Sequence, residues 1–382
     1  MKHASALMLG ALAQAVAGKP FSMPESVDWQ QLLRLSQAHS VEPLVYYGLQ
    51  RAELLQAVPE TCRQHLLAAF HRAVFRDSQF DHIREKLTRQ LTDAGVRHVF
   101  LKGACLKYDY PVPALRTMCD LDVLVHTRDY PAIDRVAQNL GGQPGDGDGN
   151  HRIFRFPGGV TVEFHPNLLH HSIPVGAGIN PGWQYARENA NELTPEGFYL
   201  NTLCHLASHF VSGGVGVRFV LDVWVNRHLR SPDMDRAFVE AELKRLRLLE
   251  FARNIEALAE CWFGEGQTTP LLEELGQYIL TSGSHGQPER AMRNALALSP
   301  GKSRSSALLK KAFYPRQELE DRFPWCKGKP WLLPAAWCTR AYRAVTRRGH
   351  LIARWSKGTA RISKEEIAEQ ARQLARFGIQ IK

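Results

Sequence analysis

Two aspartates separated by one residue, Asp120 and Asp122, lie in an apolar run that has the composition of a β-strand. Alternate side chains of a strand point to the same face, so both carboxylates project from one side while Leu121, Val123 and Val125 project from the other. Burying two carboxylates in such a strand is costly unless a cation neutralises them. We expect a divalent metal, and with it phosphoryl or nucleotidyl transfer. The alternative is a strand end whose carboxylates are solvated or paired with arginine.

A third carboxylate and a basic turn accompany the aspartates. The run at residues 160–165 alternates apolar and polar residues, with Glu163 and His165 on its polar face. A short apolar segment ends in Lys102 and Gly103, which predicts a strand, a tight turn and a helix. Glycine allows close approach of the backbone, and a helix N-terminus attracts phosphate. Together these pieces predict a sheet that carries three carboxylates next to a phosphate-binding turn.

The elements that must position these residues have the order helices, a small α/β centre, then helices. We predict strands at residues 97–101 and 119–125, a helix at 129–140, a loop at 144–149 and a hairpin at 152–165. Later helices are expected to start at the capping sequences 194–196, 231–233 and 268–270. The predicted fold class is α+β, mainly helical. Its regions are an N-terminal helical region (1–92), a core with a small mixed β-sheet (93–190), a helical region that closes the cleft (191–300) and a basic helical C-terminal region (301–382).

The composition is that of a folded protein whose net charge favours binding to anionic partners. Of 382 residues, 44% are hydrophobic and 23% are charged, which excludes a disordered chain and suits two or three domains. Lys and Arg outnumber Asp and Glu by 48 to 38, and the resulting net charge of +10 favours anionic partners. Much of this excess lies at residues 302–304, 310–311 and 340–364. This basic C-terminal region is a candidate contact for nucleic acid or an anionic membrane surface, or else a solvated helical face.

Cysteine usage and hydropathy indicate the cellular compartment in which we expect the protein. Seven scattered cysteines without a C-x-x-C pair argue against a disulfide framework or a zinc knuckle and favour a reducing, cytoplasmic setting. No segment approaches the roughly 18 apolar residues of a transmembrane helix. The N-terminal apolar stretch resembles a signal peptide only superficially, because Gln14 lies near the cleavage position and the helical pattern continues beyond it. We expect this stretch to be the first helix of the fold.

Three runs in the central segment resemble one known family. The sequence reads LKGA at residues 101–104, R-x-x-x-DLDVLV at 116–125 and VEFH at 162–165. Together these runs resemble the uncharacterised nucleotidyltransferase family of the polymerase-β-like superfamily. The resemblance spans about residues 28 to 345, because further segments agree at 204–209, 219–222, 323–324 and 333–340.

The resemblance implies a nucleotidyltransferase core, a short mixed sheet flanked by helices. Asp120, Asp122 and Glu163 would be the catalytic carboxylates and the metal ligands. In the superfamily a Gly-Ser turn precedes the two aspartates, whereas Lys102 and Gly103 hold that place here, so an ammonium group replaces the serine hydroxyl at the phosphate. The implied cofactor is Mg²⁺, as two ions, which position an NTP and activate a hydroxyl of an unknown acceptor.

Three residues have both a functional and a structural interpretation. Arg116 is expected to offset phosphate charge, and its alternative is a salt bridge that only orients Asp120. Lys102 is expected to contact phosphate, and its alternative is an exposed lysine at a strand end. His165 is expected to orient Glu163 or to contact the acceptor, and its alternative is a structural histidine.

Two further histidines, His205 and His209, lie one turn apart on a predicted helix. This spacing suits a metal, but the sequence HLASH lacks the glutamate of a zinc protease motif. We expect the helix to face the cleft, with one of the histidines touching substrate or both hydrogen-bonded in the interior. Asp222, on the next apolar helix, is expected to pair with one of them.

These patterns predict a metal-dependent nucleotidyltransferase that moves an NMP group from an NTP to a hydroxyl of a small molecule, a protein or a polynucleotide. The alternative, favoured by the missing serine, is a non-catalytic protein that binds a nucleotide or a partner through the same cleft. A third interpretation, an RNA-binding helical protein, rests only on the basic C-terminal region. That region lacks a stacking motif of aromatic and basic residues.

Overall fold

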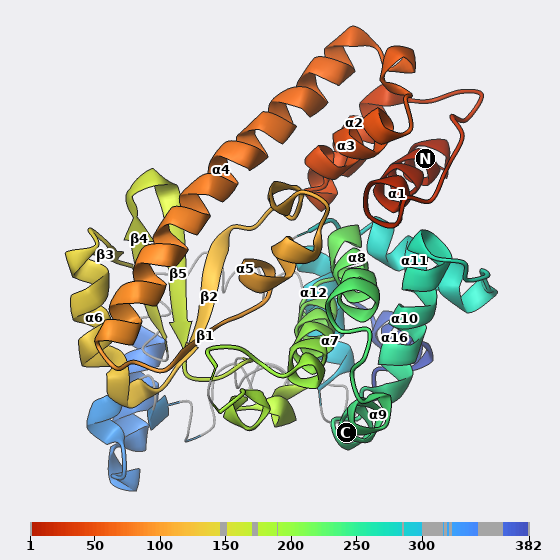
Figure 1. Ribbon diagram of the computed structural model, residues 1–382. Helices are drawn as coiled ribbons and strands as arrows, with labels where there is room; N and C mark the ends of the chain where they lie inside the picture. The colour runs from red at the N-terminus through yellow and green to blue at the C-terminus, as the bar shows by residue number, and fades with distance from the viewer. Residues whose placement is uncertain are drawn as a thin grey trace.

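The chain folds into helices around one five-stranded mixed sheet, which confirms the α+β, mainly helical class (Figure 1). The computed structural model describes residues 2–145, 151–169, 175–188, 190–284, 286–299, 316, 319–320, 323–342 and 362–380. Most of the predicted loop at 144–149 and most of the basic C-terminal segments lie outside these residues. The four predicted regions stay a prediction.

The sheet has the strand order β1-β2-β5-β4-β3. Its strands are β1 (His98–Phe100), β2 (Asp120–Val125), β3 (Gln143–Pro144), β4 (Arg152–Phe156) and β5 (Val160–His165). Only β2 and β5 pair in parallel, and all other pairs are antiparallel. The predicted hairpin is confirmed as β4–β5. Strand β3 was not predicted because two residues carry no periodicity of their own.

One face of the sheet is apolar and is covered by two helices, α4 (Glu60–Asp93) and α6 (Tyr130–Asn139). Alternate residues of β2 and β5, among them Leu121 and Phe164, pack there against Phe80 and Leu87 of α4. Figure 1 shows α4 running across the strands, with α6 beside its lower end. Because this face is filled, the polar residues of β2 and β5 must project from the other face.

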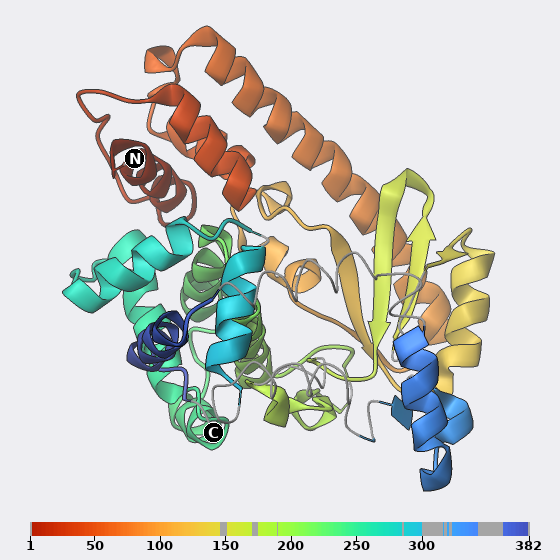
Figure 2. The ribbon, with the colours of Figure 1, turned by 180° about the vertical axis from the view of Figure 1, so that it is seen from behind.

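The opposite face of the sheet looks toward the helical part of the chain, as the view from behind shows (Figure 2). Leu124 of β2 belongs to the large core that these helices build. Among the described residues, the α-helices that follow the sheet include α7 (Pro195–Val211), α8 (Val217–Val225), α9 (Arg236–Arg245), α10 (Leu249–Phe263), α11 (Pro270–Leu280), α12 (Pro288–Ala297) and α16 (Lys364–Arg376). The short helix α5 (Gly103–Leu106) connects β1 to the segment before β2.

The N-terminal helices are α1 (Lys2–Ala17), α2 (Trp29–His39) and α3 (Glu42–Arg51), which precede α4 in the chain. Helix α1 is the first helix of the fold, and Leu7, Met8 and Leu12 are buried in the large core.

Two of the three predicted helix starts are confirmed. Thr194 caps α7 and Thr269 caps α11, each accepting a hydrogen bond from a backbone N–H three residues later. The start predicted at 231–233 is wrong, because α9 begins at Arg236 and is capped by Asp235.

The C-terminal part of the chain makes two separate packing units. Helix α16 is held on α11 and α12 by ion pairs, Arg376 to Glu274 at 2.7 Å and Arg293 to Glu366 at 3.3 Å. Residues 323–342 contribute to a small apolar cluster of their own around Phe323. Within the described part of the chain, no helix combines the length and the apolar character needed to cross a membrane.

Candidate functional site

Asp122 and Glu163 face one another across the parallel pair β2–β5, a pairing that the sequence analysis did not predict. Asp122 is the direct register partner of Glu163, and Leu124 is the partner of His165. The Nε2 atom of His165 lies 3.0 Å from Oδ1 of Asp122 and 3.4 Å from Oε2 of Glu163. His165 therefore bridges two carboxylates that would otherwise repel each other.

These three groups have the chemistry of a site for a divalent cation. Among the described residues, Asp122, Glu163 and His165 form a set whose ligand atoms all lie within 4.8 Å of one another. Carboxylate oxygens suit Mg²⁺ and Mn²⁺, and an imidazole nitrogen is a further donor for Mn²⁺ or Zn²⁺. Asp120 shares the face of Asp122 but does not belong to this set. The structure thus brings two of the three predicted metal ligands together and adds His165.

The charges of the site act unequally on the two aspartates. Burial, followed by the charge of Asp122, raises the pKa of Asp120 to about 6. Burial also acts to raise the pKa of Asp122, but Lys102 and His165 outweigh it and hold that pKa well below its usual range. Asp122 therefore stays ionised beside its two partners. A bound cation would favour the ionised form of both aspartates.

Lys102 lies at the turn between β1 and α5 and points at Asp122. Its Nζ is 2.7 Å from Oδ1 of Asp122. Lys102 also adopts φ +52° and ψ −127°, a backbone conformation that favours glycine. Such strain at a non-glycine residue typically persists at functional sites. The residue of this turn with positive φ is therefore Lys102 and not Gly103.

Gly103 is needed for a different close approach. A Cβ atom at this position would lie 2.6 Å from Nη1 of Arg116, far inside van der Waals contact. The glycine therefore makes room for a guanidinium group beneath α5.

The segment after α5 is anchored to α4 by a lysine that the sequence analysis did not single out. Lys107 is fully buried, and its Nζ lies 2.7 Å from Asp77 and 2.5 Å from Asp81. Burial opposes its charge, but hydrogen bonds from Nζ to the two carboxylates raise the pKa of Lys107 overall. No local pattern could reveal this residue, because its partners lie 26 and 30 residues earlier in the chain.

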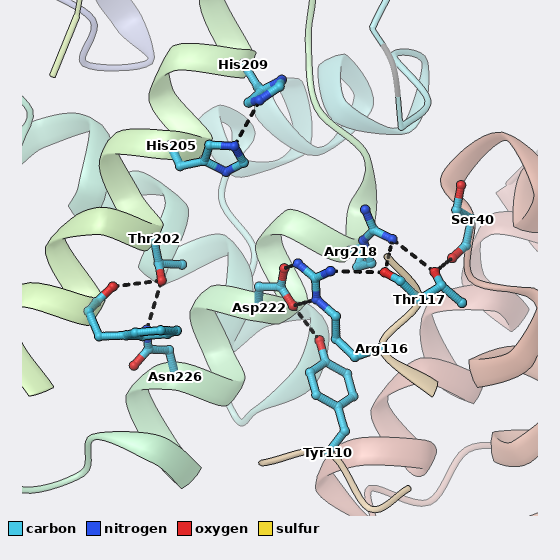
Figure 3. Close-up of polar contacts among 11 residues, drawn as sticks. Ser40, Tyr110, Arg116, Thr117, Thr202, His205, His209, Arg218, Asp222 and Asn226 are labelled. Carbon is cyan, nitrogen blue, oxygen red and sulfur yellow. Dashed lines mark hydrogen bonds and ion pairs between the residues drawn. The ribbon is translucent and has the colours of Figure 1, made fainter. Parts of the chain in front are cut away.

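Arg116 is paired with a carboxylate from a distant helix (Figure 3). Its Nη2 donates to Oδ2 of Asp222 at 2.6 Å and its Nε donates to Oδ1 at 3.1 Å, while the hydroxyl of Tyr110 donates to the same Oδ1 at 2.8 Å. The salt bridge to Asp120, which was the alternative interpretation of Arg116, is not the one that forms. The expected pairing of Asp222 with a histidine is wrong, because Arg116 and Tyr110 fill its carboxylate. This buried pair ties α8 to the segment before β2.

His205 and His209 lie one turn apart on α7, with their Nε2 atoms 3.0 Å apart. Both rings pack against Phe219 of α8, at centroid distances of 5.6 and 5.4 Å. Burial, followed by Lys102 and His209, holds the pKa of His205 well below its usual value. The charges of Lys102 and Asp122 also act on this imidazole, and Asp122 acts in the opposite direction to Lys102.

A cavity of about 380 Å³ lies elsewhere, between α11, α12 and α16. Its lining is polar and includes Arg290 and Arg293. None of the predicted site residues lines this cavity. It is therefore separate from the carboxylate site on the sheet.

Comparison with known proteins agrees with the family resemblance of the central segment. A family model described as "Uncharacterised nucleotidyltransferase" matches residues 25–264, more than half of the chain. This range contains the sheet, Lys102, the carboxylates and both helices α7 and α8. The match ends before residues 323–340, where the sequence suggested further similarity. No curated protein and no solved structure matches the chain significantly.

Proposed function

Because the chain belongs to the uncharacterised nucleotidyltransferase family, we propose that it is a metal-dependent enzyme that transfers an NMP group from an NTP to a hydroxyl acceptor. One observation carries the proposal: Asp122 and Glu163 are register partners on neighbouring strands and share His165. Carboxylates at this spacing on one sheet face suit the divalent cations that nucleotidyl transfer uses. Asp120, on the same face, is the third proposed metal ligand.

The proposed chemistry assigns a task to each side chain. The oxygen of the acceptor hydroxyl attacks the α-phosphorus, the bond to the β-phosphate oxygen breaks, and pyrophosphate leaves. Mg²⁺, as two ions held by Asp120, Asp122 and Glu163, would lower the pKa of the acceptor hydroxyl and stabilise charge on the phosphates. Glu163 takes the proton of the hydroxyl. His165, which lies between the two carboxylates, holds Glu163 beside Asp122. Lys102, next to Asp122, offsets the charge of the phosphates.

The proposal is tested by following two labels from one nucleotide. The purified full chain is incubated with Mg²⁺, a cell extract as the source of acceptors, and each NTP in turn, labelled at the α- or the γ-phosphate. Transfer of the α label without the γ label identifies nucleotidyl transfer. Asp122→Asn and Glu163→Gln should abolish it, whereas Glu250→Gln, an exposed carboxylate on α10, should not.

The alternative is a protein that binds a nucleotide without turnover. It is supported by Lys102, which stands where the superfamily has a serine and which is paired with Asp122 at 2.7 Å. Metal-dependent NTP binding without transfer of either label, to extract or to water, would favour this alternative and reject the enzyme.

A further inference from the structure

Two arginines, Arg116 in the segment before β2 and Arg218 at the start of α8, differ in how their charge is balanced. Arg116 has a bidentate ion pair with Asp222, and its Nη1 donates to the carbonyl of Thr117 at 3.0 Å. Every nitrogen of this guanidinium therefore has a partner within the protein. Although Arg116 was expected to meet phosphate, each of its guanidinium nitrogens already donates a hydrogen bond within the protein, and Asp222 balances its charge.

Arg218 lies beside this pair (Figure 3), and none of the described residues forms an ion pair with it. Its Nη1 donates to the carbonyl of Thr117 at 2.5 Å and to its hydroxyl oxygen at 3.0 Å. Its Nε is buried and has no hydrogen-bond partner within the described residues. Among the residues that the structure describes, no carboxylate oxygen lies within 4.0 Å of a guanidinium nitrogen of Arg218, the distance limit for an ion pair. The nearest acid of its helix, Asp222, is taken by Arg116.

A partly buried guanidinium without a counter-ion is unfavourable, and the neighbouring charge of Arg116 makes it more so. Burial, followed by the charge of Arg116, lowers the pKa of Arg218 to about 10. An arginine stays charged at neutral pH even then. A cationic group that the protein itself does not neutralise is suited to an anionic ligand, above all to a phosphate, which a guanidinium binds with paired hydrogen bonds.

The position of Arg218 connects it with the carboxylate site. Thr117, to which it bonds, precedes Asp120 by three residues on the same segment. Phe219, the next residue of α8, stacks on His205, on which the charges of Lys102 and Asp122 act. Arg218 therefore lies near the N-terminal end of β2, which begins with Asp120.

We infer that Arg218, and not Arg116, is the arginine that binds the triphosphate of the NTP, with the Arg116–Asp222 pair fixing the start of α8 beside Thr117. The inference rests on the proposed function, because it takes the NTP as the anion. Thr117 loses nothing essential if Arg218 is replaced. Its carbonyl keeps Arg116 as a donor, and its hydroxyl still donates to the carbonyl of Ser40 at 3.1 Å.

The test uses binding and stability, so that it does not depend on turnover. The full chain is titrated with Mg²⁺ and an α,β-methylene NTP, and separately with inorganic tripolyphosphate. The variants are Arg218→Gln, Arg218→Lys and, as a matched control, the exposed Arg253→Gln on α10. Mn²⁺ affinity and the melting temperature are measured for each.

We expect Arg218→Gln to weaken both ligands by about 10- to 100-fold, the loss expected for a charge-assisted hydrogen bond. Arg218→Lys should keep part of the affinity, and Arg253→Gln all of it. Mn²⁺ binding should not change, and the melting temperature of Arg218→Gln should equal or exceed that of the wild type, because an unbalanced, partly buried charge has been removed. A purely structural arginine would instead lower the melting temperature.

The outcomes separate this inference from the proposed function. If the wild type binds the NTP and Arg218→Gln binds it within about twofold, or if that variant loses several degrees of melting temperature, the inference is overturned and the function stands. If Arg218→Gln loses tripolyphosphate and NTP binding as expected but the wild type transfers no α label, the inference stands and the enzyme does not. A wild type that binds neither ligand rejects both.

Discussion

Asp122 lies directly opposite Glu163 in the parallel pairing of β2 and β5, and both side chains leave the sheet on the face away from α4. Parallel neighbours in register bring two negative charges together at positions 41 residues apart in the chain. The protein offsets this repulsion with His165 and Lys102, which both contact Asp122. A binding site for a divalent cation is the simplest reason to maintain such an arrangement.

The first prediction concerns metal binding. Asp122→Asn and Glu163→Gln should each weaken Mn²⁺ binding by about 100-fold or more, since even changes to outer partners of a metal site cost about 10- to 100-fold. Isothermal titration with Mn²⁺ checks this, with Glu250→Gln as a control carboxylate far from the sheet. Variants that bind Mn²⁺ like the wild type would show that the cation site does not include this pair.

The second prediction separates the charge of Lys102 from its backbone strain. Lys102→Met and Lys102→Gly both remove the ammonium group from Asp122, but only glycine relaxes the positive φ of +52°. Relief of strain outweighs the extra chain entropy of glycine, so Lys102→Gly should have a free energy of unfolding about 1 kcal/mol higher than Lys102→Met. Urea denaturation of the two proteins measures the difference. The opposite order would mean that Lys102 is unstrained in solution.

The central strands were predictable because their signal is local. Alternation of apolar and polar residues fixes which side chains of β2 and β5 share a face, so Asp122, Glu163 and His165 could be placed together before their pairing was known. The turn at Lys102 was also visible, although the residue with positive φ is the lysine and not Gly103.

The partners of the arginines could not be predicted, because they depend on contacts between distant segments. Arg116 and Asp222 are 106 residues apart. Nothing in either local pattern tells Arg116 from Arg218, yet one is neutralised by Asp222 and the other is not. Lys107 is a similar case, because a lysine in a short helix gives no sign that its side chain will be buried between two aspartates of α4.

The third prediction concerns the buried pair of Arg116 and Asp222. Arg116→Met leaves Asp222 buried with Tyr110 as its remaining donor, which should lower the free energy of unfolding by about 3–5 kcal/mol. The double variant Arg116→Met, Asp222→Leu removes both charges and should recover much of this loss. Chemical denaturation of the single and double variants tests it. Additive losses in the double variant would show that the two residues do not interact in solution.

The fourth prediction uses the close packing of Gly103 on Arg116. In Gly103→Ala the new Cβ would lie 2.6 Å from Nη1 of Arg116, a group that Asp222 holds in place. We expect a loss of about 1–3 kcal/mol in the free energy of unfolding, the usual cost of overpacking. In the background of Arg116→Met the clash disappears, so the same alanine should cost much less. An equal cost in both backgrounds would assign the role of Gly103 to its backbone.

The fifth prediction concerns acid stability and His39. This fully buried histidine is the last residue of α2 and contacts the start of α8. Its Nδ1 accepts a hydrogen bond from the backbone N–H of Val217 at 3.2 Å, and its Nε2 donates to the carbonyl of Leu280 at 3.2 Å. Only the neutral imidazole can make both bonds, because a protonated ring has no acceptor. Accordingly, burial lowers the pKa of His39, against the opposing effect of its bond to Leu280.

The sign of the pH dependence follows from this lowered pKa. Above about pH 6.5 the histidine is neutral in both the folded and the unfolded chain, so it adds no pH dependence. As the pH falls below that value the unfolded chain takes up the proton first, and stability decreases by up to about 1.4 kcal/mol per pH unit until the folded-state pKa is reached. In His39→Asn the amide oxygen can still accept from Val217 but cannot titrate. The variant should therefore be less stable at about pH 8 and lose less stability on acidification to about pH 5. Urea denaturation of both proteins across this range measures the two slopes, and equal slopes would exclude His39 as a source of acid sensitivity.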